Sequence, residues 1–243
     1  MIKFFRKIRL TLMEQNKTGK YLKYALGEIL LVMIGILLAL QVNNWNTLRL
    51  ERKLEIKILK EIQSNLETDV KNLKAKIEEN DLYLKANINV LTHLKDKTKM
   101  TGTLEKDYAS ILGHGNFRAV TVGYDNLKSE GISILSNDSL RNAIAELYDY
   151  KYYNFTENIY YAVVNLRALQ AEAIADNINT IDPYVKAIPF NLTELYDNKR
   201  FQEIANWWIH AINYINFQFQ TGINEIKSVQ VKLNEELERL ESS

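Results

Sequence analysis

One run of apolar residues, at positions 24–42, limits what this chain can fold into more than any other feature of its sequence. It reads YALGEILLVMIGILLALQV, and after Glu28 no charged residue occurs until Arg49. As an α-helix rising about 1.5 Å per residue, these nineteen residues would reach about as far as the hydrocarbon layer of a bilayer is thick. The run therefore predicts a single transmembrane helix.

The residues that border this run favour a membrane location and set an orientation. Tyr21 and Tyr24 at its start and Trp45 after its end stand where aromatic side chains anchor a helix at the two membrane interfaces. Residues 1–23 carry seven lysines and arginines against one glutamate. Because positively charged segments stay on the cytoplasmic side, we expect residues 1–23 in the cytoplasm and residues 43–243 outside it.

A cleaved signal peptide is the alternative interpretation of the same run, since it also combines a charged start with an apolar middle. The charged region before the run is too long for a signal peptide, and Ala39-Leu40-Gln41 is a poor match to the small-x-small cleavage pattern. We therefore expect an uncleaved anchor, with the lipid bilayer as its surroundings.

The first thirteen residues could also contact the membrane. MIKFFRKIRLTLM spaces its apolar residues as one face of a helix does, with basic residues between them: Lys3, Arg6, Lys7 and Arg9. This pattern is typical of a helix that lies on an anionic membrane surface. A basic tail that only sets the orientation explains the same residues, and the sequence leaves both interpretations open.

Two features of the apolar run indicate a partner within the bilayer. Glu28 is an ionisable residue in a membrane helix, so its carboxylate is a functional hypothesis and could face a partner helix. The alternative is that Glu28, about one turn inside Tyr24, reaches the headgroup layer. Gly27, Gly35 and Ala39 share one stripe on which another helix could approach closely, either from a second copy or from another membrane protein.

Beyond the membrane segment the sequence predicts long amphipathic helices. Apolar residues recur at steps of three and four over residues 47–98, 138–178 and 199–241, as in coiled coils. In the first range the pattern passes through Leu59, Ile62, Leu66, Val70, Leu73, Ile77, Leu84, Ile88 and Leu91. No glycine or proline separates Gly35 from Gly102, so the transmembrane helix should continue into this range. We expect an all-α fold, in which the long helices pack as an elongated bundle outside the membrane.

The connections between the long helices are less regular. Over residues 100–136 we expect two short helices and loops, one helix being VGYDNLKSE with Thr121 as its N-cap and Gly131 at its C-terminal end. The segment with Pro183 and Pro189 should be a loop, because no part of the chain has a convincing strand pattern.

No pattern in the sequence indicates catalysis or metal binding. There is no cysteine, and the three histidines, His93, His114 and His210, lack the spacing of a zinc-binding helix. Phosphate-binding glycine loops and the Gly-x-Ser-x-Gly motif are missing. Outside residues 1–23 acidic residues outnumber basic ones, which argues against nucleic acid as a partner. We therefore predict no catalytic residue, no metal ligand and no cofactor.

Aromatic residues exceed what one buried helix face needs in two places. Tyr148, Tyr152 and Phe155 fit the core face of their helix, so the other tyrosines nearby must face solvent or a partner. Trp207 and Trp208 are adjacent and cannot both face one core. Exposed aromatic side chains are therefore expected on both helices.

Two blocks of the sequence resemble a known family. The opening MIKFFRKIR, followed by NKTGKYLKYALGEILLVMIGILLALQVNNWN, is similar to the start shared by an uncharacterised family of single-pass membrane proteins from Bacteroidota. The stretch YDNLKSEGISILSNDSLRNAIAELYDYKY resembles a second block of that family, and together the blocks cover about a third of the chain. The resemblance implies a single-pass protein of the bacterial inner membrane with its bulk in the periplasm, and it implies no activity.

These expectations fit a non-enzymatic interaction or scaffold protein that is anchored by one helix and presents a periplasmic helical bundle to partners. The alternative is a sensor or regulatory subunit of a membrane complex, coupled to a partner through the helix that carries Glu28. The sensor function requires a further component, since residues 1–23 are too short to form a cytoplasmic output domain.

Overall fold

The computed structural model describes residues 18–242, with side chains from position 22 onward except that of Tyr24. The chain forms two compact units, residues 1–54 and residues 55–243. Helix accounts for 84% of the residues that the structure describes, which confirms the prediction of an all-α fold.

Helix α2, Thr18–Asp96, is a single helix of 79 residues that contributes to both units. In the first unit it carries the apolar run, whose side chains are exposed: Leu31 is 62% exposed and Leu38 is 58% exposed. Its length and composition would allow it to cross a membrane, since its apolar part has a mean hydropathy of 2.4. The helix ends where Lys97 takes a left-handed backbone conformation, with φ of 50°.

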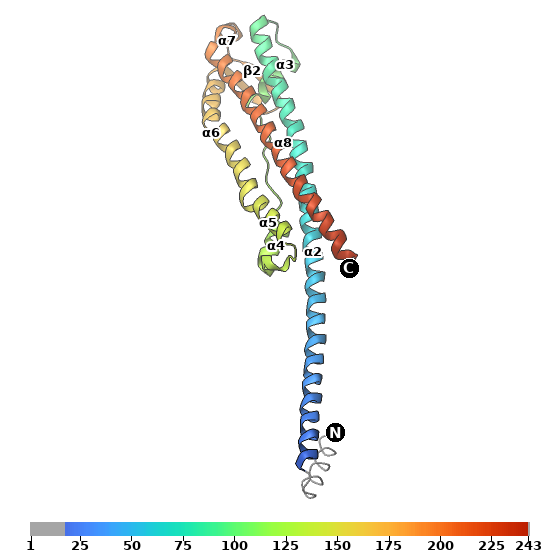
Figure 1. Cartoon of the computed structure of the whole chain (residues 1–243). Coiled ribbons are helices and arrows are strands. Elements are labelled where there is room, and N and C mark those ends of the chain that lie inside the picture. The colour runs from blue at the N-terminus through green and yellow to red at the C-terminus, as the bar shows by residue number, and fades with distance from the viewer. Residues whose placement is uncertain (1–17, 243) are drawn as a thin grey trace. The chain divides into compact units, whose positions relative to one another are not determined.

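In the second unit the C-terminal part of α2 packs beside α6, Tyr152–Asn177, and α8, Lys199–Glu241 (Figure 1). Helix α5, Asp138–Glu146, leads into α6 through a π-helical turn, η2, Leu147–Lys151. The sequence predicted one long helix over this range, with a kink near Asn154. The structure has a π turn a few residues earlier, and because such a turn contains one extra residue, it shifts the phase of the buried face between α5 and α6.

Helix α8 closes the bundle by burying one stripe along its whole length. Its buried apolar residues recur at the predicted steps of three and four: Ile204, Trp208, Ile212, Ile215, Phe219, Ile223, Ile226, Val229, Leu233, Leu237 and Leu240. Each such side chain stabilises the fold by roughly 1.5–3 kcal/mol, so this stripe dominates the packing of α8. Gly222 lies in the stripe, where a Cβ would come within 3.3 Å of the Phe155 ring on α6.

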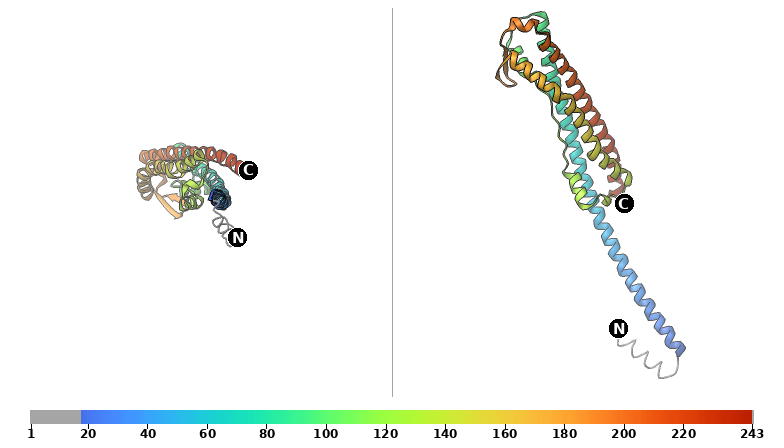
Figure 2. Two further views of the ribbon diagram at one scale, coloured as in Figure 1. Left: turned by 60° about the horizontal axis from the view of Figure 1, so that its bottom comes forward. Right: turned by 90° about the vertical axis from the view of Figure 1, so that its left-hand side faces the viewer.

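Short elements cover one end of the bundle (Figure 2). They are α3, Gly102–Ser110, strand β1, Ile178–Asp182, strand β2, Lys186–Pro189, and α7, Leu192–Asp197. The strands pair antiparallel with Ile178 opposite Pro189. The prediction of a loop here is wrong. Within these short strands only Ile178 and Ala187 are buried, so the sequence has no alternating pattern from which a strand could be recognised.

At the other end lie α4, Val122–Glu130, and a 3-10 turn, η1, Ile132–Ile134. Helix α4 begins and ends where the sequence predicted. Thr121 precedes it, although the Thr121 side chain makes no capping hydrogen bond, and Gly131 ends it with φ of 95°. Glycine adopts this conformation without the steric cost that other residues meet, which explains why the helix stops there.

An extended segment, residues 113–121, connects these two ends and is bound by side chains of α2. Asn80 Oδ1 accepts the backbone N–H of Gly115, and Asp69 Oδ1 accepts that of Val120 at 3.0 Å. Buried backbone groups need hydrogen-bond partners, and here helix side chains supply what a neighbouring strand would supply in a sheet.

The residues of α2 that bind this segment occupy core positions of the helix. The buried stripe follows a seven-residue repeat through Leu59, Ile62, Leu66, Asp69, Leu73, Asn80, Asn87, Val90 and Leu94. The predicted stripe departs from this repeat, because Val70, Ile77, Leu84 and Leu91 are only partly buried and Ile88 is 46% exposed. At Asp69 and Asn87 the repeat buries a polar residue, and a search for apolar residues selected the next residue, Val70 or Ile88, instead.

Candidate functional site

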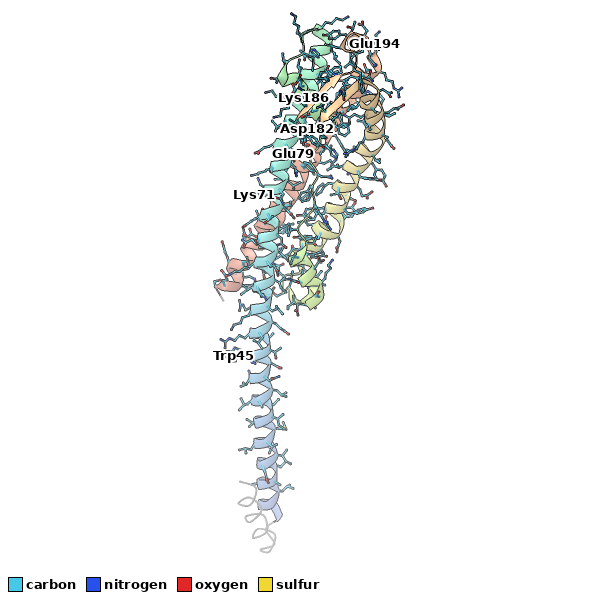
Figure 3. The ribbon with its side chains drawn as sticks, turned by 180° about the vertical axis from the view of Figure 1, so that it is seen from behind. Trp45, Lys71, Glu79, Asp182, Lys186 and Glu194 are labelled. Atoms are coloured by element: carbon cyan, nitrogen blue, oxygen red, sulfur yellow. The ribbon has the colours of Figure 1, made fainter. Side chains whose placement is uncertain are left out.

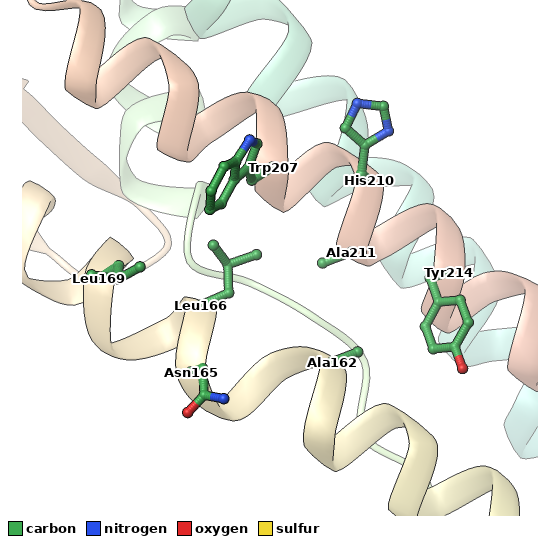
Figure 4. A pocket seen from close by; sticks show the side chains of 8 residues that line it. All are labelled: Ala162, Asn165, Leu166, Leu169, Trp207, His210, Ala211 and Tyr214. Atoms are coloured by element: carbon green, nitrogen blue, oxygen red, sulfur yellow. The ribbon is translucent and has the colours of Figure 1, made fainter.

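A groove runs along one face of the pair of helices α6 and α8. Its first hollow, of about 450 Å³, is lined by Ala162, Asn165, Leu166, Leu169, Trp207, His210, Ala211 and Tyr214 (Figure 4). A second hollow, of about 180 Å³, includes Asn158 of α6 and Gln218 of α8 in its walls. Asn158 lies four residues from Ala162, and Gln218 lies four residues from Tyr214, so each pair shares one helix face. The two hollows together form what we call the α6/α8 groove.

Ion pairs join the two helices at both ends of the α6/α8 groove. Arg200 Nη2 lies 3.1 Å from Glu172 Oε2, and Lys151 Nζ lies 2.6 Å from Glu225 Oε2. Exposed pairs of this kind contribute at most about 1 kcal/mol each, less than one buried apolar side chain. The packing around Gly222 therefore holds the helices together, and the ion pairs fix their register.

The walls of the α6/α8 groove carry almost no charge. Helix α8 has no acidic residue, lysine or arginine between Glu203 and Glu225, and between Glu157 and Glu172 helix α6 has only Arg167. The exposed side chains in these stretches are mostly aromatic, aliphatic or amide. Charged residues usually cover exposed helix faces, whereas depletion of charge with enrichment of aromatic residues marks the centre of protein interfaces.

Two aromatic side chains of α8 line the groove: Trp207, which is 55% exposed, and Tyr214, which is 39% exposed. Phe217 of the same helix is 64% exposed and lines neither hollow. In Figure 4, Trp207 of α8 and Leu166 of α6 point toward one another, while His210 points away from α6. Trp208, next to Trp207, is fully buried. As predicted, the two tryptophans do not face one core.

The tyrosines of η2 and α6 divide between core and surface in the predicted way. Tyr148 and Tyr152 are 8% and 5% exposed, whereas Tyr153, Tyr160 and Tyr161 are all more than half exposed. None of the three exposed tyrosines lines either hollow of the α6/α8 groove. Exposed aromatic residues therefore also occur outside the groove.

A fully buried carboxylate, Asp69, is the functional candidate that sequence reasoning missed. Its Oδ2 accepts a hydrogen bond from the Tyr152 hydroxyl at 2.7 Å, and its Oδ1 accepts the Val120 N–H. Burial raises the pKa of Asp69 to about 6, against the lowering effect of these two hydrogen bonds. The signal was present in the sequence, because Asp69 lies three residues after Leu66 and four before Leu73, in the repeat that both occupy.

The three histidines have separate surroundings. His93 is buried at the end of α2, with Nδ1 3.0 Å from the Tyr108 hydroxyl, and burial lowers its pKa. The ring of His114 meets that of Trp208 edge to face at 5.7 Å, and burial lowers the pKa of His114 as well. His210 is exposed at the α6/α8 groove. Within residues 18–242, no group of three or more histidine, aspartate or glutamate side chains is arranged to hold a metal ion.

The residues predicted to act in the membrane lie on the first part of α2. Glu28 is half-buried, and Ala39 is exposed. A Cβ added at Gly27 or Gly35 would meet no atom within 4 Å. Trp45, labelled in Figure 3, is 64% exposed. The side chains of Tyr21 and Tyr24 lie outside the described part, as do the residues Lys3, Arg6, Lys7 and Arg9.

The fold and the groove define an all-helical protein with one long apolar helix and an uncharged face on its helical bundle. The chain belongs to a family of unknown function, DUF6090, whose sequence model matches residues 28–181. This range includes α6 but not α8. No curated protein and no solved structure matches the chain.

Proposed function

We propose that this protein is a non-enzymatic interaction protein, anchored in the bacterial inner membrane by the apolar part of α2 and binding partners through the α6/α8 groove. In this proposal residues 1–23 lie in the cytoplasm and the helical bundle lies in the periplasm. The observation that carries it is the uncharged, aromatic face on α6 and α8, because exposed aromatic residues without charge are typical of surfaces that bind another molecule.

The exposed apolar side chains of α2 support the membrane anchor. Large aliphatic residues from Leu26 to Val42 are all at least 50% exposed. Soluble monomers rarely expose apolar patches of more than a few hundred Å², so a surface of this kind favours lipid or a partner helix as its surroundings. The seven basic residues among residues 1–23 support the cytoplasmic location of the N-terminus.

The alternative function is a sensor or regulatory subunit that couples to a multi-pass partner through the membrane helix. One specific observation favours it. Glu28 stands in the apolar run beside the small residues Gly27 and Gly35, whose surroundings leave space for another helix. A partner that packs there, either a second copy or another membrane protein, is compatible with both functions.

The topology can be tested with single cysteines, because the chain has none of its own. Lys85→Cys, an exposed position on α2, should react with a membrane-impermeant maleimide on intact spheroplasts. The matched control Lys17→Cys should react only after lysis. If only Lys17→Cys is labelled on intact spheroplasts, the proposed orientation is wrong and the opposite one holds.

The interaction function predicts that full-length protein purified from membranes in mild detergent is part of a larger complex. Mass determination of the purified species would show whether it contains several copies or a second protein. A protein that purifies alone and monomeric over a wide range of concentrations would contradict the proposal.

A further inference from the structure

We propose that the α6/α8 groove binds the same groove of a second copy of this chain, in a symmetric dimer. This inference rests on the proposed function, because it names the partner of the interaction surface. It goes beyond a contact in the bilayer, since it locates the dimer interface on the bundle.

The first argument is the shape of the surface. A two-fold interface uses one patch on both subunits, so that patch must hold both projecting side chains and the hollow that receives them. Trp207 projects from α8 and is 55% exposed. The hollow of about 450 Å³ opens beside it, with Ala162 and Ala211 among its small lining residues. The face therefore carries both parts of a self-complementary contact.

The second argument is charge. A patch that pairs with itself brings charges near the two-fold axis close to identical charges, and a patch with net charge of one sign would repel its own copy. Between Glu203 and Glu225 helix α8 has no fixed charge. The two charged side chains that line the second hollow, Lys151 and Glu225, already neutralise each other at 2.6 Å. The α6/α8 groove is thus neutral where self-association requires it.

The third argument is size. Eight residues line the first hollow and nine line the second, fewer than the roughly 20–30 residues that each side of a standard interface contributes. Two copies anchored in one membrane have a higher effective concentration than two free proteins. An interface of this size is therefore suited to subunits that the proposed anchor already brings together.

The test uses the full-length protein in mild detergent and measures its mass by light scattering over a range of concentrations. The wild type should be a dimer. Trp207→Glu places a charge in the first hollow of each subunit and should convert the dimer to monomer. The matched control is Val231→Glu on the same helix, which is 57% exposed, lines neither hollow and should leave the dimer intact. Circular dichroism should be unchanged in both variants, because both side chains are exposed.

Cysteine cross-linking in native membranes gives a second readout. With mild oxidation His210→Cys, in the α6/α8 groove, should form a disulfide-linked dimer at least tenfold faster than Leu82→Cys, which is 70% exposed on α2. Equal rates at the two positions would overturn the proposal.

Other outcomes separate the two proposals. A dimer that survives Trp207→Glu but is lost in Gly35→Ile would overturn the groove interface and leave the interaction function in place. If the groove binds a different protein and no second copy, the proposed dimer is likewise overturned and the interaction function stands. A wild type that is monomeric and without any partner would overturn both.

Discussion

Replacement of Asp69 by asparagine should stabilise the bundle at neutral pH. Burial raises the pKa of Asp69 from 3.8 to about 6, so the folded chain holds this proton more tightly than the unfolded chain does. The stability that the proton contributes is fully present below about pH 4 and is lost as the pH rises through about 6. With 1.36 kcal/mol per pKa unit, the loss is about 3 kcal/mol.

Asparagine resembles the protonated carboxyl group and does not titrate. Its Oδ1 can still accept the Val120 N–H, and its amide can donate to the Tyr152 oxygen, which at present donates to Asp69. The Asp69→Asn variant should therefore match the wild type near pH 4 and exceed it by up to about 3 kcal/mol near pH 8.

The assay is urea unfolding of the full-length protein in detergent at pH values from about 4 to 8, followed by tryptophan fluorescence. The buried indole of Trp208 reports on the bundle. Glu67→Gln is the matched control, because it replaces an exposed carboxylate on the same helix. A difference between Asp69→Asn and the wild type that is the same at every pH would refute the reasoning.

Two further predictions concern other parts of the chain. Gly123→Ala should lower the free energy of unfolding by about 1–3 kcal/mol, because the added Cβ would lie 2.9 Å from the backbone nitrogen of Ile62. Thermal unfolding measures this change. An unchanged midpoint would contradict the close packing of α4 on α2. Glu28→Gln should leave assembly in mild detergent unchanged if Glu28 only reaches the headgroups, whereas loss of a bound partner would favour the coupled subunit.

Local signals were sufficient to predict the elements whose ends or faces depend on their own residues. Gly131 ends α4 because the required backbone conformation suits glycine, so the end of this helix can be predicted from the local sequence alone. The stripe of α8 has the expected period because nearly every core position on it is apolar. Trp208 is buried and Trp207 is exposed for an equally local reason, since adjacent positions on a helix face different directions.

The features that sequence reasoning missed depend on residues far away in the chain. Asn80 and Asn87 stand at core positions because they bind backbone groups more than twenty residues later in the chain, those of Gly115 and Ile111. The seven-residue repeat marks these positions and that of Asp69 as core, but only the distant backbone groups explain why polar residues occupy them. Of the α6/α8 groove, the sequence predicted only that one of the two adjacent tryptophans would be exposed, because the shape of the groove depends on how α6 and α8 lie against each other.

The polar residues in the repeat of α2 also affect when this helix can pair. A ribosome completes α2 before the extended segment, so the newly made helix presents its stripe while its proper partner is still missing. Two such helices from neighbouring chains could form a parallel coiled coil through their leucines. Asp69, Asn80 and Asn87 oppose that pairing, since each would be buried without the backbone group it binds in the finished fold. Asp69 and Asn80, which bind the segment, and Asn87, which donates to the Ile111 carbonyl just before it, thus keep α2 available for its own chain.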